Sequence, residues 1–267
     1  MTEEKRKDYL LPASIIIAAL LISGAWIYTA GLKNTKSDNS PAVTPPGTAA
    51  TEGINIKPVS ADDHTLGNPE APLKIVEFSD LECPFCKSFH PTMKRVMQEY
   101  GKDGRVAWVY RHYPLDELHP KARTEAEASE CASELGDNEK FWAYVDRVFA
   151  VTPSNNGLDL NQLPDIAEYV SLDKKKFQSC LDSGKYADKI KADVEDAQNA
   201  GARGTPYTVF VMNKKIKDGV VSFINDLNAK YSGQSPIFSV SSDGTRIGMS
   251  GALPYEDVKS IIEQVLK

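Results

Sequence analysis

The sequence contains little cysteine and lacks an excess of basic residues. Only four of its 267 residues are cysteine, so it is not a small secreted scaffold held together by many disulfides. It has 31 Lys+Arg against 37 Asp+Glu, a formal net charge of −6, which argues against a nucleic-acid partner. Because 41% of the residues are hydrophobic, the chain can still build one large core or two small ones.

The N-terminal part of the chain contains a long apolar stretch. Residues 9–31 carry no charge, and roughly 20 apolar residues suffice for a helix to cross a bilayer. We therefore predict a transmembrane anchor at residues 9–31, an uncleaved signal. Basic residues 5–7 precede it, which by the positive-inside rule makes residues 1–8 a cytoplasmic tail. A cleaved signal peptide, with small residues at 23–25, is the alternative, and both interpretations export the rest of the chain.

Residues 32–60 are predicted to be a disordered linker. They are rich in Pro, Ser, Thr and Asn and have no apolar period, so they cannot bury enough surface to offset their ordering entropy. The remaining residues, 61–267, then form a single domain outside the cytoplasm, in the periplasm or at the outer surface of the membrane.

The order of the expected elements in residues 61–267 predicts an α/β fold that carries a helical insertion. A strand, a helix and a second strand come first, then a block of helices, and then further strands and a final helix. Strands are expected at 73–78, 106–110 and 207–212, with a hairpin of 237–240 and 245–249, and helices at 85–97, 120–135, 139–149, 161–170, 173–199 and 254–267.

Two cysteines, Cys83 and Cys86, lie where the first strand passes into the first helix. Backbone N–H groups and the helix dipole stabilise a thiolate at a helix N-terminus and can lower its pKa to roughly 3.5–7.5. A stabilised thiolate is a good leaving group, so a Cys83–Cys86 disulfide would pass readily to another protein. We predict that Cys83 is attacked in the mixed disulfide and that Cys86 is the resolving thiol.

The pair has two alternative interpretations, a structural disulfide and half of a zinc site. Four-thiolate zinc sites usually combine two CxxC motifs, whereas the remaining cysteines, Cys131 and Cys180, lie far apart in the sequence. No metal site is therefore expected. The histidines His64, His112 and His119 show no ligand spacing either.

Three segments, Val76–Cys86, Gly204–Pro206 and Gly251–Tyr255, resemble the DsbA-like thiol:disulfide oxidoreductases of the thioredoxin superfamily. The resemblance extends over nearly all of residues 59–267. It implies a thioredoxin fold with an inserted helical domain at about residues 115–195. It also implies that Pro206 is a cis-proline beside the active-site disulfide, which leaves the backbone of Thr205 free to pair with an extended substrate.

The resemblance assigns roles to two further positions. Glu77 corresponds to a buried acid that assists proton transfer at the resolving cysteine, and burial would raise its pKa as this role requires. A Glu that faces water on an edge strand is the alternative. Pro91 corresponds to the proline that bends the active-site helix. The neighbouring His90 could tune Cys83, but we expect it to be exposed or to cap the helix.

Cys131 and Cys180 both fall in the expected helical insertion, so they are predicted to form a second, structural disulfide. Such a bond would close a loop of roughly 50 residues and contribute about 4 kcal/mol in the chain-entropy model. Some members of the family carry a pair of this kind, and two buried free thiols are the alternative. The acidic residues Asp193, Glu195 and Asp196 are expected to form a solvated helix face.

The sequence departs from the family pattern in two places. Pro84 and Phe85 stand between the reactive cysteines, where the strongest oxidases have Pro-His, and the missing histidine predicts a less oxidising potential. An insertion at residues 214–235 replaces the tight hairpin usual after the 207–212 strand. It could cover a sheet edge or adapt the surface to a partner.

These observations predict a membrane-tethered thiol:disulfide oxidoreductase that donates its disulfide to unfolded exported proteins. The exchange needs no diffusible cofactor, so reoxidation requires a membrane partner, by analogy a quinone-linked protein. One alternative is a disulfide reductase or isomerase, and another is a non-redox binding or chaperone module on the same fold.

Overall fold

The computed structural model describes residues 53–231 and 236–267. The predicted tail and anchor, and the linker up to residue 52, lie outside these residues. Within the two described segments, no helix is both long and apolar enough to span a bilayer. The last part of the predicted linker does not match the expectation of disorder. Ile54 and Ile56 are buried against the sheet, so the ordered domain begins before residue 61.

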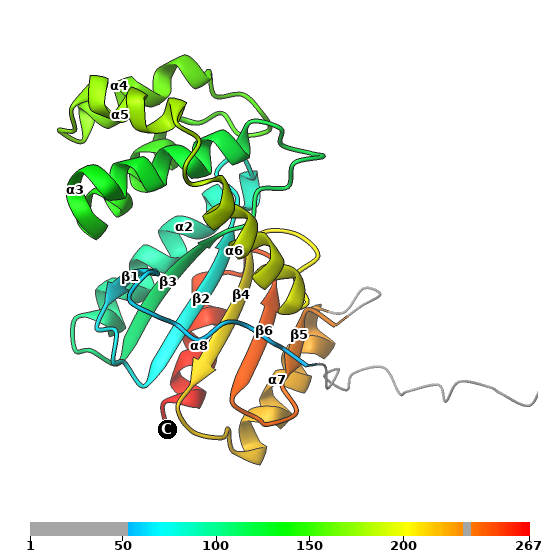
Figure 1. Ribbon diagram of the computed structural model, residues 1–267. Helices are drawn as coiled ribbons and strands as arrows, with labels where there is room; N and C mark the ends of the chain where they lie inside the picture. The colour runs from blue at the N-terminus through cyan, green and yellow to red at the C-terminus, as the bar shows by residue number, and fades with distance from the viewer. Residues whose placement is uncertain (1–52, 232–235) are drawn as a thin grey trace, which may run out of the picture. The chain divides into compact units, whose positions relative to one another are not determined.

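A six-stranded mixed sheet lies at the centre of the domain, in the order β1-β3-β2-β4-β6-β5 (Figure 1). The central neighbours β2 and β3 are parallel, and the other neighbouring pairs are antiparallel. The expected strands are present, whereas β1 was not predicted because its four residues are too few for a recognisable alternation. The strands are β1 (His64–Gly67), β2 (Leu73–Ser79), β3 (Val106–His112), β4 (Tyr207–Met212), β5 (Phe238–Val240) and β6 (Arg246–Ser250).

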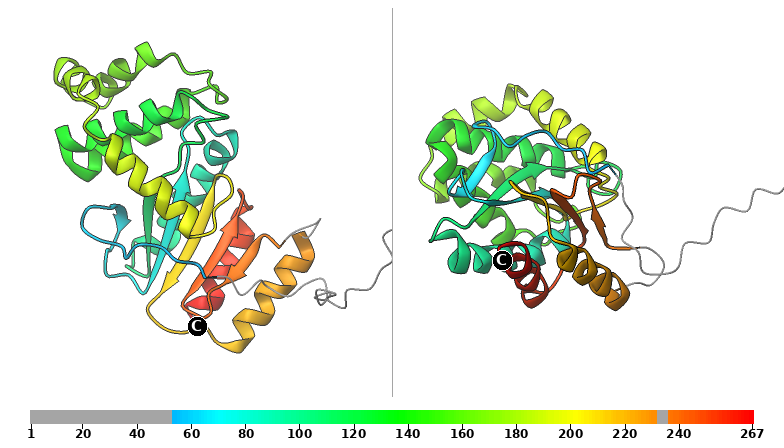
Figure 2. Two further views of the ribbon diagram at one scale, coloured as in Figure 1. Left: turned by 45° about the vertical axis from the view of Figure 1, so that its right-hand side comes forward. Right: turned by 90° about the horizontal axis from the view of Figure 1, so that it is seen from below.

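Helices cover both faces of the sheet, with α2 and α8 on one face and α6 on the other (Figures 1 and 2). Helices α3, α4 and α5 belong to the insertion between β3 and β4, and α7 lies between β4 and β5 in the chain. The helices are α2 (Pro84–Val96), the π-helical turn η1 (Met97–Gly101), α3 (Ala122–Val151), the 3₁₀ turn η2 (Leu160–Gln162), α4 (Leu163–Tyr169), α5 (Lys174–Asp182), α6 (Ala187–Asn199), α7 (Asp218–Tyr231) and α8 (Tyr255–Val265).

The domain has two apolar cores, one on each face of the sheet, and the central strand β2 contributes side chains to both. Leu73 and Ile75 belong to the apolar core that contains α2, α8 and most of the insertion, while Val76 and Phe78 belong to the core under α6. Since successive strand residues point to opposite faces, an almost continuous apolar run is what a strand covered on both sides requires.

The structure has two helix breaks in the insertion, of which the sequence predicted one and not the other. Gly136 and Asp137 depart from helical backbone angles inside α3, so the expected separation into helices 120–135 and 139–149 corresponds to its two halves. The single helix predicted over 173–199 is wrong. Gly184 has a φ of +61° and ends that helical run between α5 and α6, a conformation that glycine adopts without steric cost.

The insertion at 214–235 contains helix α7, which packs beside the edge strand β5. Asn228 is buried, and its side-chain amide bonds the Phe238 backbone in both directions. Asn228 Nδ2 donates to the carbonyl oxygen at 3.0 Å, and the Phe238 N–H donates to Asn228 Oδ1 at 2.8 Å. The amide thus takes the place of a neighbouring strand, which favours the first of the two expected roles, covering the sheet edge.

Candidate active site

The reactive pair lies where β2 passes into α2. Cys83 is the N-cap residue of α2 and Pro84 follows as the first helical residue, a position where the missing N–H costs nothing. Cys83 and Cys86 are both buried and are free thiols, so the structure shows the dithiol form. Phe85 between them is exposed over 64% of its surface. The turn therefore presents an apolar ring beside a largely covered sulfur.

The pKa values of the two thiols are shifted in opposite directions from the ordinary value of cysteine. A hydrogen bond from the Cys86 thiol is the main cause that lowers the pKa of Cys83 to about 6, and the contact to Thr205 and backbone N–H groups of the first turn act in the same direction. Burial, followed by the neighbouring Cys83, raises the pKa of Cys86 well above its ordinary value. Cys83 is thus the thiolate of the pair near neutral pH, and Cys86 keeps its proton.

The loop before β4 lies against Cys83. The Thr205–Pro206 peptide bond is cis, and Cys83 Sγ is 3.4 Å from the carbonyl oxygen of Thr205. On the far side of the proline, the Gly251 N–H donates to the Pro206 carbonyl at 2.9 Å. The structure thus brings together the cysteines and the Gly204–Pro206 segment, which are separated by more than a hundred residues in the sequence.

Glu77 is completely buried in β2, which lies between β3 and β4 rather than at an edge. The alternative of a water-facing edge residue is therefore wrong. Trp108 Nε1 donates to Glu77 Oε2 at 3.0 Å, and burial raises the pKa of Glu77 to about 7. The Glu77 charge is also one of the groups that raise the pKa of Cys86. A carboxyl with this pKa can hold or release a proton near neutral pH, beside the thiol that needs one.

Sequence reasoning missed the acids that shape the turn before Cys83. Asp80 is buried, and its carboxylate accepts from the Glu82 N–H at 2.8 Å, from the Leu115 N–H at 2.8 Å and from His119 Nδ1 at 2.9 Å. These bonds tie the turn to the start of the insertion. The acidic run Asp80-Leu81-Glu82 directly before the first cysteine was the available signal.

His90 is buried, whereas an exposed or helix-capping position was expected. Its Nε2 lies 2.7 Å from Asp146 Oδ1, and its ring packs between Trp108 and Phe149. Helix α3 supplies Asp146 and Phe149, so the insertion covers the side chain that the isolated helix would expose. Pro91 follows it inside α2, where it removes one helical N–H donor.

The other two cysteines lie in the insertion. A disulfide joins Cys131 of α3 to Cys180 of α5, with a Cα–Cα distance of 5.8 Å and a sequence separation of 49. Both sulfurs are buried. The bond fastens two helices of the insertion to each other and lies outside the turn that carries Cys83.

The expected solvated acidic face is wrong for two of its three residues. Asp196 is buried and accepts from Arg111 Nη1 at 2.6 Å, and the Asp193 carboxylate accepts from the backbone N–H of His112 at 3.1 Å. Only Glu195 is exposed. The periodicity of α6 could not indicate this, because the buried partner Arg111 comes from β3.

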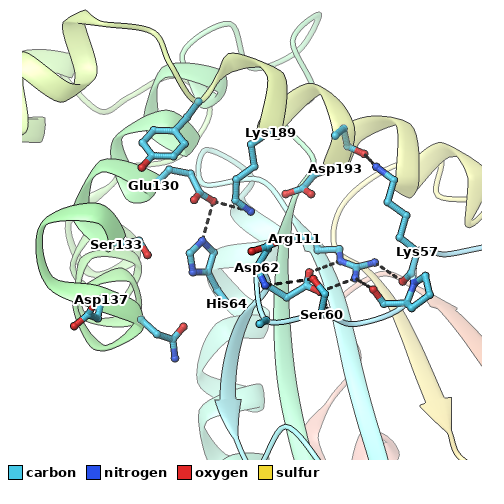
Figure 3. A pocket seen from close by; sticks show the side chains of 16 residues that line it. Lys57, Ser60, Asp62, His64, Arg111, Glu130, Ser133, Asp137, Lys189 and Asp193 are labelled. Atoms are coloured by element: carbon cyan, nitrogen blue, oxygen red, sulfur yellow. Dashed lines mark hydrogen bonds and ion pairs between the residues drawn. The ribbon is translucent and has the colours of Figure 1, made fainter.

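A polar cavity of about 670 Å³ lies between the N-terminal segment, α3 and α6 (Figure 3). Arg111 binds both Asp63 oxygens, at 2.7 and 2.9 Å, and the Lys57 carbonyl at 3.0 Å. On the other side of the cavity, Glu130 Oε1 accepts from Lys189 and lies within hydrogen-bond distance of His64. The ion pairs Arg111–Asp63 and Lys189–Glu130 thus line the cavity. Among residues 53–231 and 236–267 no cluster of His, Cys, Asp and Glu could hold a metal ion.

Comparisons with known proteins agree with the fold. The thioredoxin family matches residues 60–226. The crystal structure of Pseudomonas aeruginosa DsbA2 is 26% identical, covers 78% of this chain and 96% of that chain, and superposes with a TM-score of 0.55. Wolbachia pipientis α-DsbA1 is 22% identical over 78% of this chain and 92% of that one, with a TM-score of 0.58, and shares the fold.

Curated relatives carry a different name. The chain is 36% identical over 169 residues to a protein of Salinispora tropica named Na(+)/H(+) antiporter NhaA 3, a match that covers 62% of this chain and 24% of that protein. A protein of Salinispora arenicola named Na(+)/H(+) antiporter NhaA 1 is 35% identical over 59% of this chain and 23% of its own length. The chain thus spans about a quarter of the length of these relatives.

Proposed function

The chain belongs to the thioredoxin family as a DsbA-like protein, and from that premise we propose that it donates a Cys83–Cys86 disulfide to unfolded exported proteins. The observation that carries this proposal is the opposite acidity of the two thiols on one helical turn. A pair in which one thiolate is stable and the other thiol is protonated favours release of the disulfide to a substrate. We do not propose antiporter activity for this chain, although the relatives' names give it.

The exchange proceeds in two steps that balance. A substrate thiolate attacks Cys83 Sγ of the oxidised protein, a mixed disulfide forms, and Cys86 leaves as a thiolate that takes a proton. Glu77 is the proposed donor of that proton. A second substrate thiolate then attacks the substrate sulfur of the mixed disulfide, and Cys83 leaves as a stable thiolate. The substrate loses two electrons, and the Cys83–Cys86 pair gains them.

The site of action and the redox partner are part of the same proposal. We place residues 1–8 in the cytoplasm, an anchor at 9–31 in the membrane, and the catalytic domain outside. Support comes from the uncharged stretch and the basic residues before it. Because exchange uses no diffusible cofactor, a membrane protein must reoxidise the dithiol, by analogy a quinone-linked one.

The redox state of the full-length protein in cells tests the direction of transfer. Alkylation of thiols in rapidly acidified cells separates the two forms by mass. A donor of disulfides is mostly oxidised at Cys83–Cys86, whereas a reductase or isomerase is mostly reduced. The second direction has one observation in its favour, the apolar Phe85 where the strongest oxidases have histidine. A measured reduction potential as high as theirs would remove it.

A further inference from the structure

The residue directly before Cys83 binds a loop of the helical insertion. This loop, residues 152–158, follows α3, and Glu82 accepts hydrogen bonds from it at three atoms. The Asn155 N–H donates to the Glu82 carbonyl oxygen at 2.8 Å, and the Gly157 and Leu158 N–H groups donate to the two carboxylate oxygens at 3.2 Å each. Glu82 is completely buried, so these bonds form away from water.

The same loop also binds the helix just after Cys86. Lys87 Nζ donates to the Thr152 carbonyl at 2.5 Å. The loop is thus attached on both sides of the Cys83–Cys86 turn, although it lies about 70 residues further along the chain. Lys121, at the start of the insertion, donates to the carbonyls of Asn156 and Leu158 and fixes the end of the loop.

The backbone of the loop is unusual. Ser154, Asn155 and Asn156 have φ values of +65°, +53° and +65°, three successive residues other than glycine in the left-handed region. Such conformations persist only where the surroundings over-determine them, and they concentrate at functional sites. The three bonds to Glu82, together with those from Lys87 and Lys121, hold this segment beside the cysteines.

A second buried acid lies beside the Glu82 carboxylate. Glu125, in the first turn of α3, is completely buried, and burial followed by a side-chain hydrogen bond with the adjacent Glu82 raises its pKa to about 10. Glu125 is therefore a neutral acid at physiological pH. Each Glu82 oxygen also accepts from an N–H group of the loop.

We propose that loop 152–158 forms part of the surface that receives an extended protein substrate beside Cys83, and that Glu82 is the positioning residue that holds it there. The inference rests on the proposed function and names its substrate contacts. Pro153 and Asn155 are exposed on the loop, and Phe85 is exposed on the turn that the loop binds. One amide and two apolar groups suit an unfolded polypeptide, whose main chain offers hydrogen bonds and whose side chains are partly apolar. A small dithiol reacts with the Cys83 sulfur and does not need the surrounding surface.

Kinetics of the full-length Glu82→Gln variant separate these two kinds of substrate. Glutamine offers one acceptor oxygen to two N–H groups, so the loop loses a bond while the side-chain volume is kept. We expect the KM for a reduced, unfolded protein to rise about tenfold and its kcat to change by less than about twofold. Oxidation of dithiothreitol should also change by less than about twofold. Glu195→Gln, at the exposed glutamate of α6, is the matched control and should leave both reactions unchanged.

Each outcome bears on one of the two proposals. Equal losses with both substrates would mean that Glu82 acts on the Cys83 sulfur itself, and unchanged kinetics would mean that the loop does not contact substrate. Either result overturns the inference. An unmodified protein that cannot oxidise dithiothreitol would refute the proposed function instead.

A crosslinking experiment tests the loop without disturbing Glu82. A photoreactive residue replaces Pro153 in a Cys86→Ser protein whose Cys83 is first converted to its mixed disulfide with thionitrobenzoate. The thiolate of an unfolded substrate with a single cysteine then attacks Cys83 Sγ, thionitrobenzoate leaves, and the substrate stays bound at Cys83 as a mixed disulfide. After reduction of the disulfide, crosslinked substrate is expected from position 153. The same residue placed at the exposed Lys175 of α5 is the control and should give none. No crosslink from position 153 would contradict the assignment of the loop.

Discussion

The two cysteine pairs use the same bond for opposite purposes. Cys83 and Cys86 stand three residues apart at a helix N-terminus, and their environments push the two pKa values apart. Cys131 and Cys180 stand 49 residues apart on two packed helices and are joined in the structure. The first pair is therefore suited to exchange its bond, and the second to keep it. Position on the fold, rather than the chemistry of cysteine, makes the difference.

Replacing Cys83, the low-pKa member of the reactive pair, gives the largest expected effect. We predict that Cys83→Ser abolishes disulfide exchange, with a loss of at least about 10³-fold, because serine cannot form the mixed disulfide. Oxidation of a reduced protein substrate by the purified full-length variant measures this. Unchanged oxidation by the variant would contradict the role of Cys83, whereas a parent protein that oxidises no substrate would favour the non-redox binding or chaperone alternative.

Removal of the second pair should affect stability and leave exchange in place. We predict that a Cys131→Ala/Cys180→Ala protein loses about 4 kcal/mol of unfolding free energy, since its unfolded chain is no longer closed into a loop. Chemical denaturation followed by tryptophan fluorescence measures the change. The rate of dithiothreitol oxidation in the folded variant serves as the control and should stay within about twofold of the parent. If that rate fell with the stability, the division between the two pairs would be wrong.

Glu77 is the proposed proton donor of the reactive pair, and the Cys131–Cys180 disulfide needs no such donor. We predict that Glu77→Gln slows exchange about 10²-fold, because the amide keeps the Trp108 hydrogen bond but cannot donate a proton to the leaving Cys86. The parent rate should fall as the pH rises, with a midpoint near pH 7, the pKa of Glu77, because only the protonated carboxyl can donate. This inflection should be absent from the pH profile of the variant. A stopped-flow pH series provides the measurement. An inflection that survives in Glu77→Gln would assign the proton to another group.

Much of this organisation was predictable because it depends on short sequence patterns. The turn between β2 and α2, the cysteines within it and the apolar run around Glu77 are all local. The bonds from Glu82 to loop 152–158 connect residues more than 70 positions apart, and no periodicity in either segment indicates the other. The Arg111 cluster was missed for the same reason, since the α6 acids look solvated until β3 supplies their partner.

The smallest predicted effect concerns how the reactive pair sets its own acidity. The thiol of Cys86 is the main cause of the low pKa of Cys83, so Cys86→Ala should raise that pKa from about 6 by ~1 unit. Because the thiolate is the reactive form, iodoacetamide alkylation of the reduced parent should rise through pH 6, and the curve of the variant should lie at higher pH. Cys86→Ser keeps a hydroxyl donor and should fall between them. If all three curves coincide, the helix N-terminus alone lowers the pKa, and the pair differs from Cys131 and Cys180 by its place in the helix rather than by the contact between its two thiols.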